Sequence, residues 1–293
     1  MLVAEKFEVS EARDRKIQLD LLELNRLRLT PATPTGAWRE DVRRLSTLTL
    51  VEGDFLEALR DLVADEAAAV PTKPRHFINW FTQLESTAPG QHDDLFPWLA
   101  ERASLDQMKW FLAQEVAGEA GFEDLTALTQ VRLPSQPKLE MARNYWDEMG
   151  RGNRKGMHGP LLQRLSDALK LRPDPAETVT EALMLANLMA GLALNRRYAY
   201  HSVGALGAIE LTAPGRAALV NDGLKRLGCS ADIRHYFSLH AVLDVRHSQT
   251  WNAQVILPLV EQDAAIATAI AEGALMRLHC GAACFEQYRT RLW

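Results

Sequence analysis

Cysteine is scarce in this chain of 293 residues, which contains only three. So few thiols, and an odd number of them, offer no disulfide framework and no set of thiolates for a structural zinc site. Cys280 and Cys284 lie close to His279 and could be interpreted as a metal cluster. Because their segment has the pattern of a final amphipathic helix, we interpret both as small buried side chains.

Long apolar runs and an excess of positive charge are also absent. The longest apolar stretch, residues 182–194, falls short of the ~18 residues that a membrane span needs. The charged amino-terminal segment lacks the apolar region of a signal peptide, so we expect a cytoplasmic protein with no membrane partner. Lysine and arginine number 33 against 38 acidic residues, and no basic stripe suggests nucleic acid as a partner.

Alternating β-branched runs are almost missing, whereas helical periodicity dominates from about residue 93 to the end. This pattern predicts an all-α fold. Residues 45–51 (LSTLTLV) are the only plausible strand, and they could equally be a loop before a helix. Helices are expected over residues 9–28, 54–69, 95–103, 105–130, 137–149, 159–171, 176–212, 214–227, 231–255 and 263–292.

One predicted helix carries ionisable side chains on its apolar face. At 100° per residue, His240, Asp244 and His247 fall at about 0°, 40° and −20°. Burying a carboxylate and two imidazoles without partners costs several kcal/mol, and a metal ion is the usual remedy. His235 lies about 140° away on the polar face, where a histidine is solvated. The spacing alone leaves open that Asp244 only hydrogen-bonds a neighbouring histidine in a bundle core.

Acidic residues also occupy apolar faces of two other predicted helices. Glu115 and Glu119 lie among apolar residues of the helix expected over 105–130, with Glu115 closer to the centre of that face. Glu210 aligns with the apolar residues of the helix expected over 176–212. These placements supply further inward-facing carboxylates and favour a metal site.

A glycine-rich loop separates two further candidate ligands, Glu148 and His158. Its glycines let the chain reverse tightly, which could bring both side chains to one centre. The loop does not match a nucleotide-binding glycine pattern. Three imidazoles and four carboxylates, with no thiolate, favour iron or manganese over structural zinc, and seven ligands are too many for one ion. The sequence therefore predicts a site for two metal ions between helices.

Arg196 is the one candidate for contacting a substrate. It lies on the same predicted helix face as Glu210, but roughly 21 Å away along a straight helix. Arg196 could anchor a substrate carboxylate at the mouth of a pocket, or it could be a salt-bridged arginine of the bundle.

Four segments in order resemble the haem-oxygenase-like diiron oxidases and oxygenases, also called iron-containing redox enzymes. They are FLAQEVAGEAGFEDLTAL, YWDEMGRGNRKGMH, GALGAIELTAP and HAVLDVRH, and the resemblance covers roughly residues 75–293. It implies a haem-oxygenase-like bundle of about seven core helices. We expect this domain over residues 86–293, with residues 1–85 forming a helical extension packed on it.

The resemblance also implies a ligand set, with a His158/His247 side and a His240/Asp244 side. N-oxygenating members of the family carry an additional glutamate, for which Glu115 or alternatively Glu119 could serve. Members that cleave C–C bonds generally use six ligands, so the chain resembles the N-oxygenases more closely. The six iron ligands implied by resemblance are Glu148, His158, Glu210, His240, Asp244 and His247.

From this resemblance we expect an oxygenase with two Fe(II)/Fe(III) ions, O2 as co-substrate and an external electron donor. It would oxidise an amine or amino-acid-derived substrate to a hydroxylamine, nitroso or nitro product in a specialised-metabolite pathway. The alternatives are an oxidative C–C lyase or desaturase acting on an aliphatic acid or amino acid, and a metal-free binding bundle. The sequence leaves open whether the substrate is bound to a carrier protein and whether the protein forms a homodimer.

Overall fold

The computed structural model describes residues 11–34, 36–118 and 121–293. Within these ranges the chain is helical and contains no strand, which confirms the all-α prediction. The α-helices are α2 (Glu11–Leu29), α3 (Trp38–Ala68), α4 (Pro74–Thr87), α5 (Leu95–Glu101), α6 (Leu105–Gly118), α7 (Phe122–Thr129), α8 (Ser135–Glu148), α9 (His158–Leu169), α10 (Thr180–Leu194), α11 (Ala199–Arg226), α12 (His235–Trp251), α13 (Leu257–Gln262) and α14 (Ile266–Leu292).

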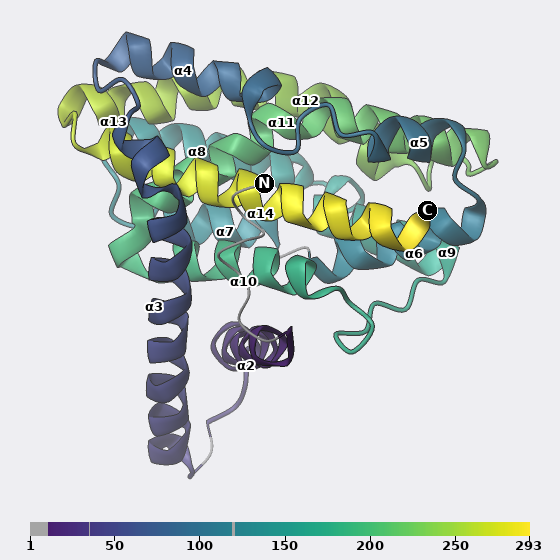
Figure 1. Ribbon diagram of the computed structural model, residues 1–293, viewed down its shortest axis with the longest axis horizontal. Helices are drawn as coiled ribbons and strands as arrows, with labels where there is room; N and C mark the ends of the chain where they lie inside the picture. The colour runs from purple at the N-terminus through teal and green to yellow at the C-terminus, as the bar shows by residue number, and fades with distance from the viewer. Residues whose placement is uncertain (1–10, 35, 119–120) are drawn as a thin grey trace.

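Helices α11 and α14 form the central pair of the bundle. Helix α11 packs against both α12 and α14, and α10 packs against the other side of α14. In Figure 1, α14 crosses the middle of the molecule between an upper group that includes α11 and α12 and a lower group that includes α10. The segment Arg196–Arg226 is long and apolar enough to cross a membrane by composition alone, but 61% of its most apolar window is buried inside the bundle.

Two glycines allow the backbones of α11 and α14 to touch. A Cβ atom added to Gly204 would lie 1.9 Å from the carbonyl oxygen of Ile270, and one added to Gly273 would lie 1.9 Å from that of His201. No side chain can fit between these helices at the crossing. The close approach fixes the position of α11, which carries Glu210.

We expect Gly204→Ala to lower the free energy of unfolding by about 2–3 kcal/mol, because the new methyl group must push two rigid backbones apart. Gly215→Ala, in the same helix, is the matched control, since nothing lies within 4 Å of its Cβ position. That change should be neutral or stabilise by about 0.5–1 kcal/mol through helix propensity. Denaturant unfolding measures both values, and equal stabilities would contradict the close crossing.

The strand expected over residues 45–51 is wrong, because this segment lies inside α3. The hydroxyls of Ser46, Thr47 and Thr49 each donate to the carbonyl oxygen four residues earlier in the same helix. β-Branched residues lower helix propensity only slightly, and such hydroxyl bonds are common within helices. Helix α3 therefore begins at Trp38, well before the expected start at residue 54.

Other helix boundaries also differ from the sequence prediction. The helix expected over residues 105–130 is divided into α6 and α7, and Gly121, with a φ of 74°, precedes α7. The helix expected over residues 176–212 is divided at Asn195, whose side chain accepts a hydrogen bond from the backbone N–H of Arg197 and caps a new turn. Pro214, expected to begin a helix, lies within α11.

The amino-terminal helices pack on the rest of the bundle. Asn25 of α2 donates a hydrogen bond of 2.8 Å to Asn187 of α10, and both side chains are buried. Helix α3 contacts α14, and its first half extends beyond the bundle (Figure 1). Helix α4 contributes Phe77 and Phe81 to the main core. The exact end of the extension, placed at residue 85 from the sequence, stays a prediction.

Candidate metal centre

Six of the predicted ligands come together between α8, α9, α11 and α12. Five of these side chains are buried, with 2–4% of their surface exposed, and His240 is half-buried. They form two groups of three, and within each group the potential ligand atoms all lie within 4.8 Å of one another. The first group is Glu148, His158 and His240, and the second is Glu210, Asp244 and His247.

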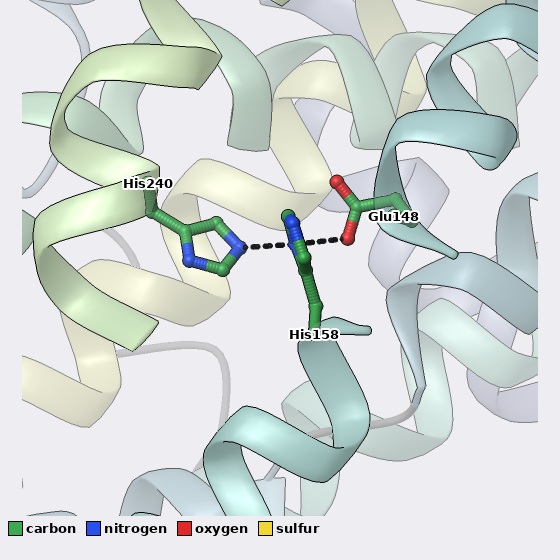
Figure 2. A group of neighbouring side chains, drawn as sticks. All are labelled: Glu148, His158 and His240. Atoms are coloured by element: carbon green, nitrogen blue, oxygen red, sulfur yellow. Dashed lines mark hydrogen bonds and ion pairs between the residues drawn. The ribbon is translucent and has the colours of Figure 1, made fainter. Parts of the chain in front are cut away.

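In the first group, His158 lies between the other two side chains (Figure 2). Its Nδ1 atom is 2.5 Å from Oε2 of Glu148 and 3.0 Å from Nε2 of His240. The Nδ1 atom of His240 lies 2.7 Å from the carbonyl oxygen of Tyr236, one turn earlier in α12. Because a carbonyl only accepts, His240 carries its proton on Nδ1 and presents the Nε2 lone pair to the site.

The glycine-rich loop brings Glu148 and His158 together, as its composition predicts. Glu148 is the last residue of α8, and His158 is the first residue of α9. Between them, Gly150 and Gly152 adopt φ values of 61° and 82°, which glycine tolerates best. A Cβ atom on Gly150 would lie 2.5 Å from the backbone carbon of Gly156, so the reversal also requires glycine for space.

In the second group, His247 has an unpartnered nitrogen directed at two carboxylates. Its Nδ1 atom is 3.5 Å from Oε2 of Glu210 and 3.9 Å from Oδ1 of Asp244, and it makes no hydrogen bond. On its other side, Nε2 lies 3.2 Å from Oδ2 of Asp147. Asn144 donates a bond of 2.5 Å to Oε1 of Glu210. Asp147 therefore orients His247, and Asn144 orients Glu210.

Sequence reasoning did not assign these orienting roles to Asn144 and Asp147. Both belong to α8, one turn and one residue before Glu148, and polar residues near a helix end are too common to stand out. The expected division into a His158/His247 side and a His240/Asp244 side is also wrong. His240 and His247 are two turns apart on α12, roughly 10 Å, so they reach different groups, and His158 at the start of α9 meets the nearer one.

The pKa values show how strongly these groups perturb one another. Burial, followed by the charges of Glu210 and Glu148, raises the pKa of Asp244 well above its usual value. Burial lowers the pKa of His158 and of His240 to about 4, so both imidazoles are neutral ligands at pH 7. Burial also opposes protonation of His247, but Glu210 and Asp147 outweigh it and raise the pKa to about 9.

These observations match a pair of metal ions. Two donors that each lie ~2.1 Å from one ion at right angles are ~3 Å apart, close to the observed separations of 2.5, 3.0 and 3.5 Å. The Nδ1 atom of His247 makes no hydrogen bond, and Asp244 is a carboxylate crowded by two others. A cation bound between them, after His247 has lost its proton, would satisfy both. A donor set of nitrogen and oxygen atoms without thiolates suits iron or manganese.

Metal binding should therefore depend on pH. Because His247 must lose its proton before Nδ1 can bind an ion, we expect the apparent Fe(II) affinity to rise about tenfold per unit between about pH 6 and 9. Anaerobic titration with Fe(II) at a series of pH values, with proton release recorded, measures this. Asp147→Asn should shift the profile to lower pH, since it removes one cause of the raised pKa. A flat profile without proton release would contradict the assignment.

Glu115 lies near these ligands but outside both groups. It lines the same cavity and accepts a hydrogen bond from the hydroxyl of Tyr288. Burial raises the pKa of Glu115, and the charges of Arg277 and Arg216 act in the opposite direction. Its role as a seventh ligand stays a prediction. Glu119, the alternative, lies outside the residues that the structure describes.

Arg196 does not reach this site. Its side chain is exposed and donates hydrogen bonds to the carbonyl oxygens of Leu128, Thr129 and Val131, at the end of α7. These bonds satisfy carbonyls that the end of a helix leaves free. These hydrogen bonds account for Arg196 without a role in substrate binding.

A cavity of about 190 Å³ adjoins the two groups. Four of the six ligands line it, and aromatic and aliphatic side chains such as Phe111, Phe237 and Leu185 form much of the remaining wall. Cys284 also lines the cavity, and with Cys280 it is a buried free thiol, as the sequence predicts. By the ~10–15 Å³ that one water requires, the cavity holds on the order of ten waters, so it suits a small molecule.

Two groups of carboxylates and imidazoles, supplied by four helices of one bundle, fit a site for two metal ions. The chain belongs to the family of iron-containing redox enzymes, which it matches over residues 109–282, more than half of its length. It is therefore an oxidoreductase of a family that uses iron.

The same fold occurs in two solved structures of a CADD-like protein of unknown function from Nostoc punctiforme. One has a TM-score of 0.59 at 16% identity and covers 76% of this chain and 99% of its own. The other has a TM-score of 0.55 at 18% identity and covers 76% of this chain and 96% of its own. They confirm the haem-oxygenase-like fold. No curated protein matches this chain.

Proposed function

We propose that the protein is a diiron oxygenase that uses O2 to N-oxygenate a small amine or amino-acid-derived substrate. The observation that carries this proposal is the arrangement of six nitrogen and oxygen donors, five of them on buried side chains, in two adjacent groups beside a cavity. When bound, two iron ions would supply the electrons and the open coordination positions that O2 activation requires.

The residues of the chain have separate tasks in this proposal. Glu148, His158 and His240 would hold one ion, and Glu210, Asp244 and His247 the other. The Tyr236 carbonyl, Asn144 and Asp147 keep these ligands in fixed orientations. The apolar cavity wall positions a substrate next to the ligands and excludes water from the reaction.

The test is iron analysis followed by product analysis. The full chain, loaded anaerobically with Fe(II), should bind two ions, and Mössbauer spectra should show two ferrous sites. After addition of O2, a reductant and a panel of amines and amino acids, mass spectrometry should detect products heavier by one oxygen atom, labelled by 18O2. Failure to bind two ions would instead favour a metal-free binding bundle.

A second candidate, oxidative C–C cleavage or desaturation of an aliphatic acid or amino acid, is favoured by one observation. The six-ligand set is complete without Glu115, which faces Tyr288 and two arginines. Six ligands are typical of the family members that cleave C–C bonds. In that case the products would be alkenes or fragments without added oxygen.

Glu115→Gln separates these two candidates. If Glu115 is a seventh ligand, as N-oxygenation implies, this variant should still bind two Fe(II) ions, while its Mössbauer parameters change and product formation falls at least ~10-fold. Glu286→Gln, an exposed acid on α14, is the control. Unchanged spectra in Glu115→Gln would support the six-ligand candidate.

The remaining parts of the proposal concern the surroundings of the enzyme. We place it in the cytoplasm, with an external electron donor and a small-molecule substrate that is free or held by a carrier protein. Neither nucleic acid nor a membrane is a proposed partner. Sedimentation analysis would decide between a monomer and a homodimer.

A further inference from the structure

Two arginines line the cavity at a distance from the six ligands. Arg216 belongs to α11, six residues after Glu210 and therefore ~9 Å further along the helix. Arg277 belongs to α14, on the same face as Cys284 and Tyr288, which follow at helical spacings of seven and eleven residues. Both arginines and four of the metal ligands line one continuous cavity.

Neither arginine forms an ion pair with a carboxylate. No carboxylate of the described residues lies within 4.0 Å of either guanidinium, although ten arginine–carboxylate pairs occur elsewhere in that part of the chain. Arg216 donates one hydrogen bond of 2.9 Å, to the hydroxyl of Thr212. The Nε atom of Arg277 is buried and has no hydrogen-bond partner. Buried donors of this kind are normally satisfied, so their isolation indicates a missing acceptor.

The two guanidiniums are held in place by their surroundings. The Arg216 guanidinium lies 5.8 Å from the ring centre of Phe96 and 5.4 Å from that of Phe285. Gly281, one turn after Arg277, leaves room for the other guanidinium, because a Cβ atom there would lie 2.6 Å from Nη1 of Arg277. Such packing reduces the entropy lost when the two side chains bind a ligand.

The charge balance at this end of the cavity favours a monoanion. Burial, followed by the charge of Arg277, lowers the pKa of Arg216 to about 9, which shows the cost of holding two cations together. Glu115 acts on both arginines, and its single charge balances one of them at most. Asp93 also acts on Arg216, but Asp93 forms an ion pair with Arg289. If Glu115 turns towards a metal ion, both guanidinium charges stay unbalanced.

We propose that Arg216 and Arg277 form a carboxylate-binding subsite, so that the substrate is a small carboxylic acid whose other end reaches the metal ligands. This inference rests on the proposed function for the reaction, but carboxylate binding itself does not require metal. For an N-oxygenase, the substrate would be an amino acid with its amine some distance from its carboxylate. A guanidinium pair matches a carboxylate in charge and in hydrogen-bond geometry.

The test compares ligands of equal length and different head groups. Calorimetry on the full chain, metal-free and loaded anaerobically with Fe(II), would measure the binding of hexanoate, 1-hexanol, hexylamine, hexylphosphonate and 6-aminohexanoate. We expect hexanoate and 6-aminohexanoate to bind more tightly than hexanol and hexylamine in both forms. Binding of hexylphosphonate in preference to hexanoate, or equal binding of hexanoate and hexanol, would overturn the proposal.

Variants then test whether the preference for carboxylates comes from the two arginine side chains. Arg216→Met and Arg277→Met should each weaken hexanoate binding about 10- to 100-fold and leave hexanol binding unchanged. Arg277→Lys, which keeps the charge and disturbs the fold least, should show an intermediate loss. The control, Arg291→Met, changes an exposed arginine of α14 and should bind hexanoate as the wild type does. Wild-type hexanoate affinity in both methionine variants would refute the subsite.

The two proposals can fail separately. Two Fe(II) ions per chain in the arginine variants, with weakened carboxylate binding, support both proposals. A protein that binds hexanoate through the arginines but takes up no iron would refute the oxygenase proposal and leave the subsite standing. A protein that binds two ions but shows no preference for carboxylates would refute the subsite and leave the oxygenase proposal standing.

Discussion

His240→Ala should weaken binding of one Fe(II) ion about 100- to 1,000-fold and abolish O2-dependent turnover. The estimate follows from the ~10–16 kcal/mol that four ligands together supply in structural metal sites, or roughly 2.5–4 kcal/mol for each ligand. In our proposal each ion is held by a separate group, so the stoichiometry should fall from two ions towards one. Anaerobic Fe(II) titration and activity assays measure both effects.

His235→Ala is the matched control for this experiment. His235 is the first residue of α12, the helix that carries His240, and its side chain is exposed. This variant should keep both iron ions and full activity. Both variants should retain the helical circular dichroism spectrum of the wild type, since His240 contributes to the site more than to the apolar core. Full iron occupancy and activity in His240→Ala would refute the metal centre.

Asp244→Asn should have opposite effects on the metal-free and the iron-loaded protein. Without metal, Asp244 is a buried carboxylate close to two others, and replacing it should raise the free energy of unfolding by about 1–3 kcal/mol near neutral pH. With metal, the loss of an anionic ligand should weaken Fe(II) binding about 100- to 1,000-fold. A purely structural carboxylate would not produce this reversal.

The stabilisation of the metal-free protein by Asp244→Asn should increase with pH. Because the folded-state pKa of Asp244 is raised above its unfolded value of ~3.9, this group favours the folded state at low pH and opposes it as pH rises. The stabilisation by Asp244→Asn should therefore be near zero at about pH 4 and grow towards neutral pH. Chemical unfolding with a chelator present measures it, and Glu286→Gln should remain within about 0.5 kcal/mol of wild type. A constant difference across pH would contradict the raised pKa.

The ligands were predictable from sequence where helical geometry alone decides their direction. His240, Asp244 and His247 share one helix, so their common face follows from the residue spacing, and the exposed His235 follows from the same rule. The glycines between Glu148 and His158 likewise indicate a tight reversal. Boundaries were predicted less well, because Pro214 and the threonines of α3 are accommodated inside helices that tertiary packing stabilises.

The pairing of ligands and the arginine subsite depend on contacts between helices that are distant in sequence. His158 could have met either histidine of α12, and only the packing of α9 against that helix places it beside His240. Arg216 and Arg277 are 61 residues apart and meet because glycines let α11 and α14 touch.

The scarcity of cysteine excluded a thiolate centre at the outset, and periodicity then determined the all-α fold and the inward direction of the candidate ligands. These properties are local, since they depend on side-chain chemistry and on the geometry of a single helix. The tertiary structure alone decided which candidate ligands lie in one group, that Glu115 faces arginines, and that Arg196 caps a helix. Those outcomes depend on how helices pack, and residue spacing within one helix contains no information on its neighbours.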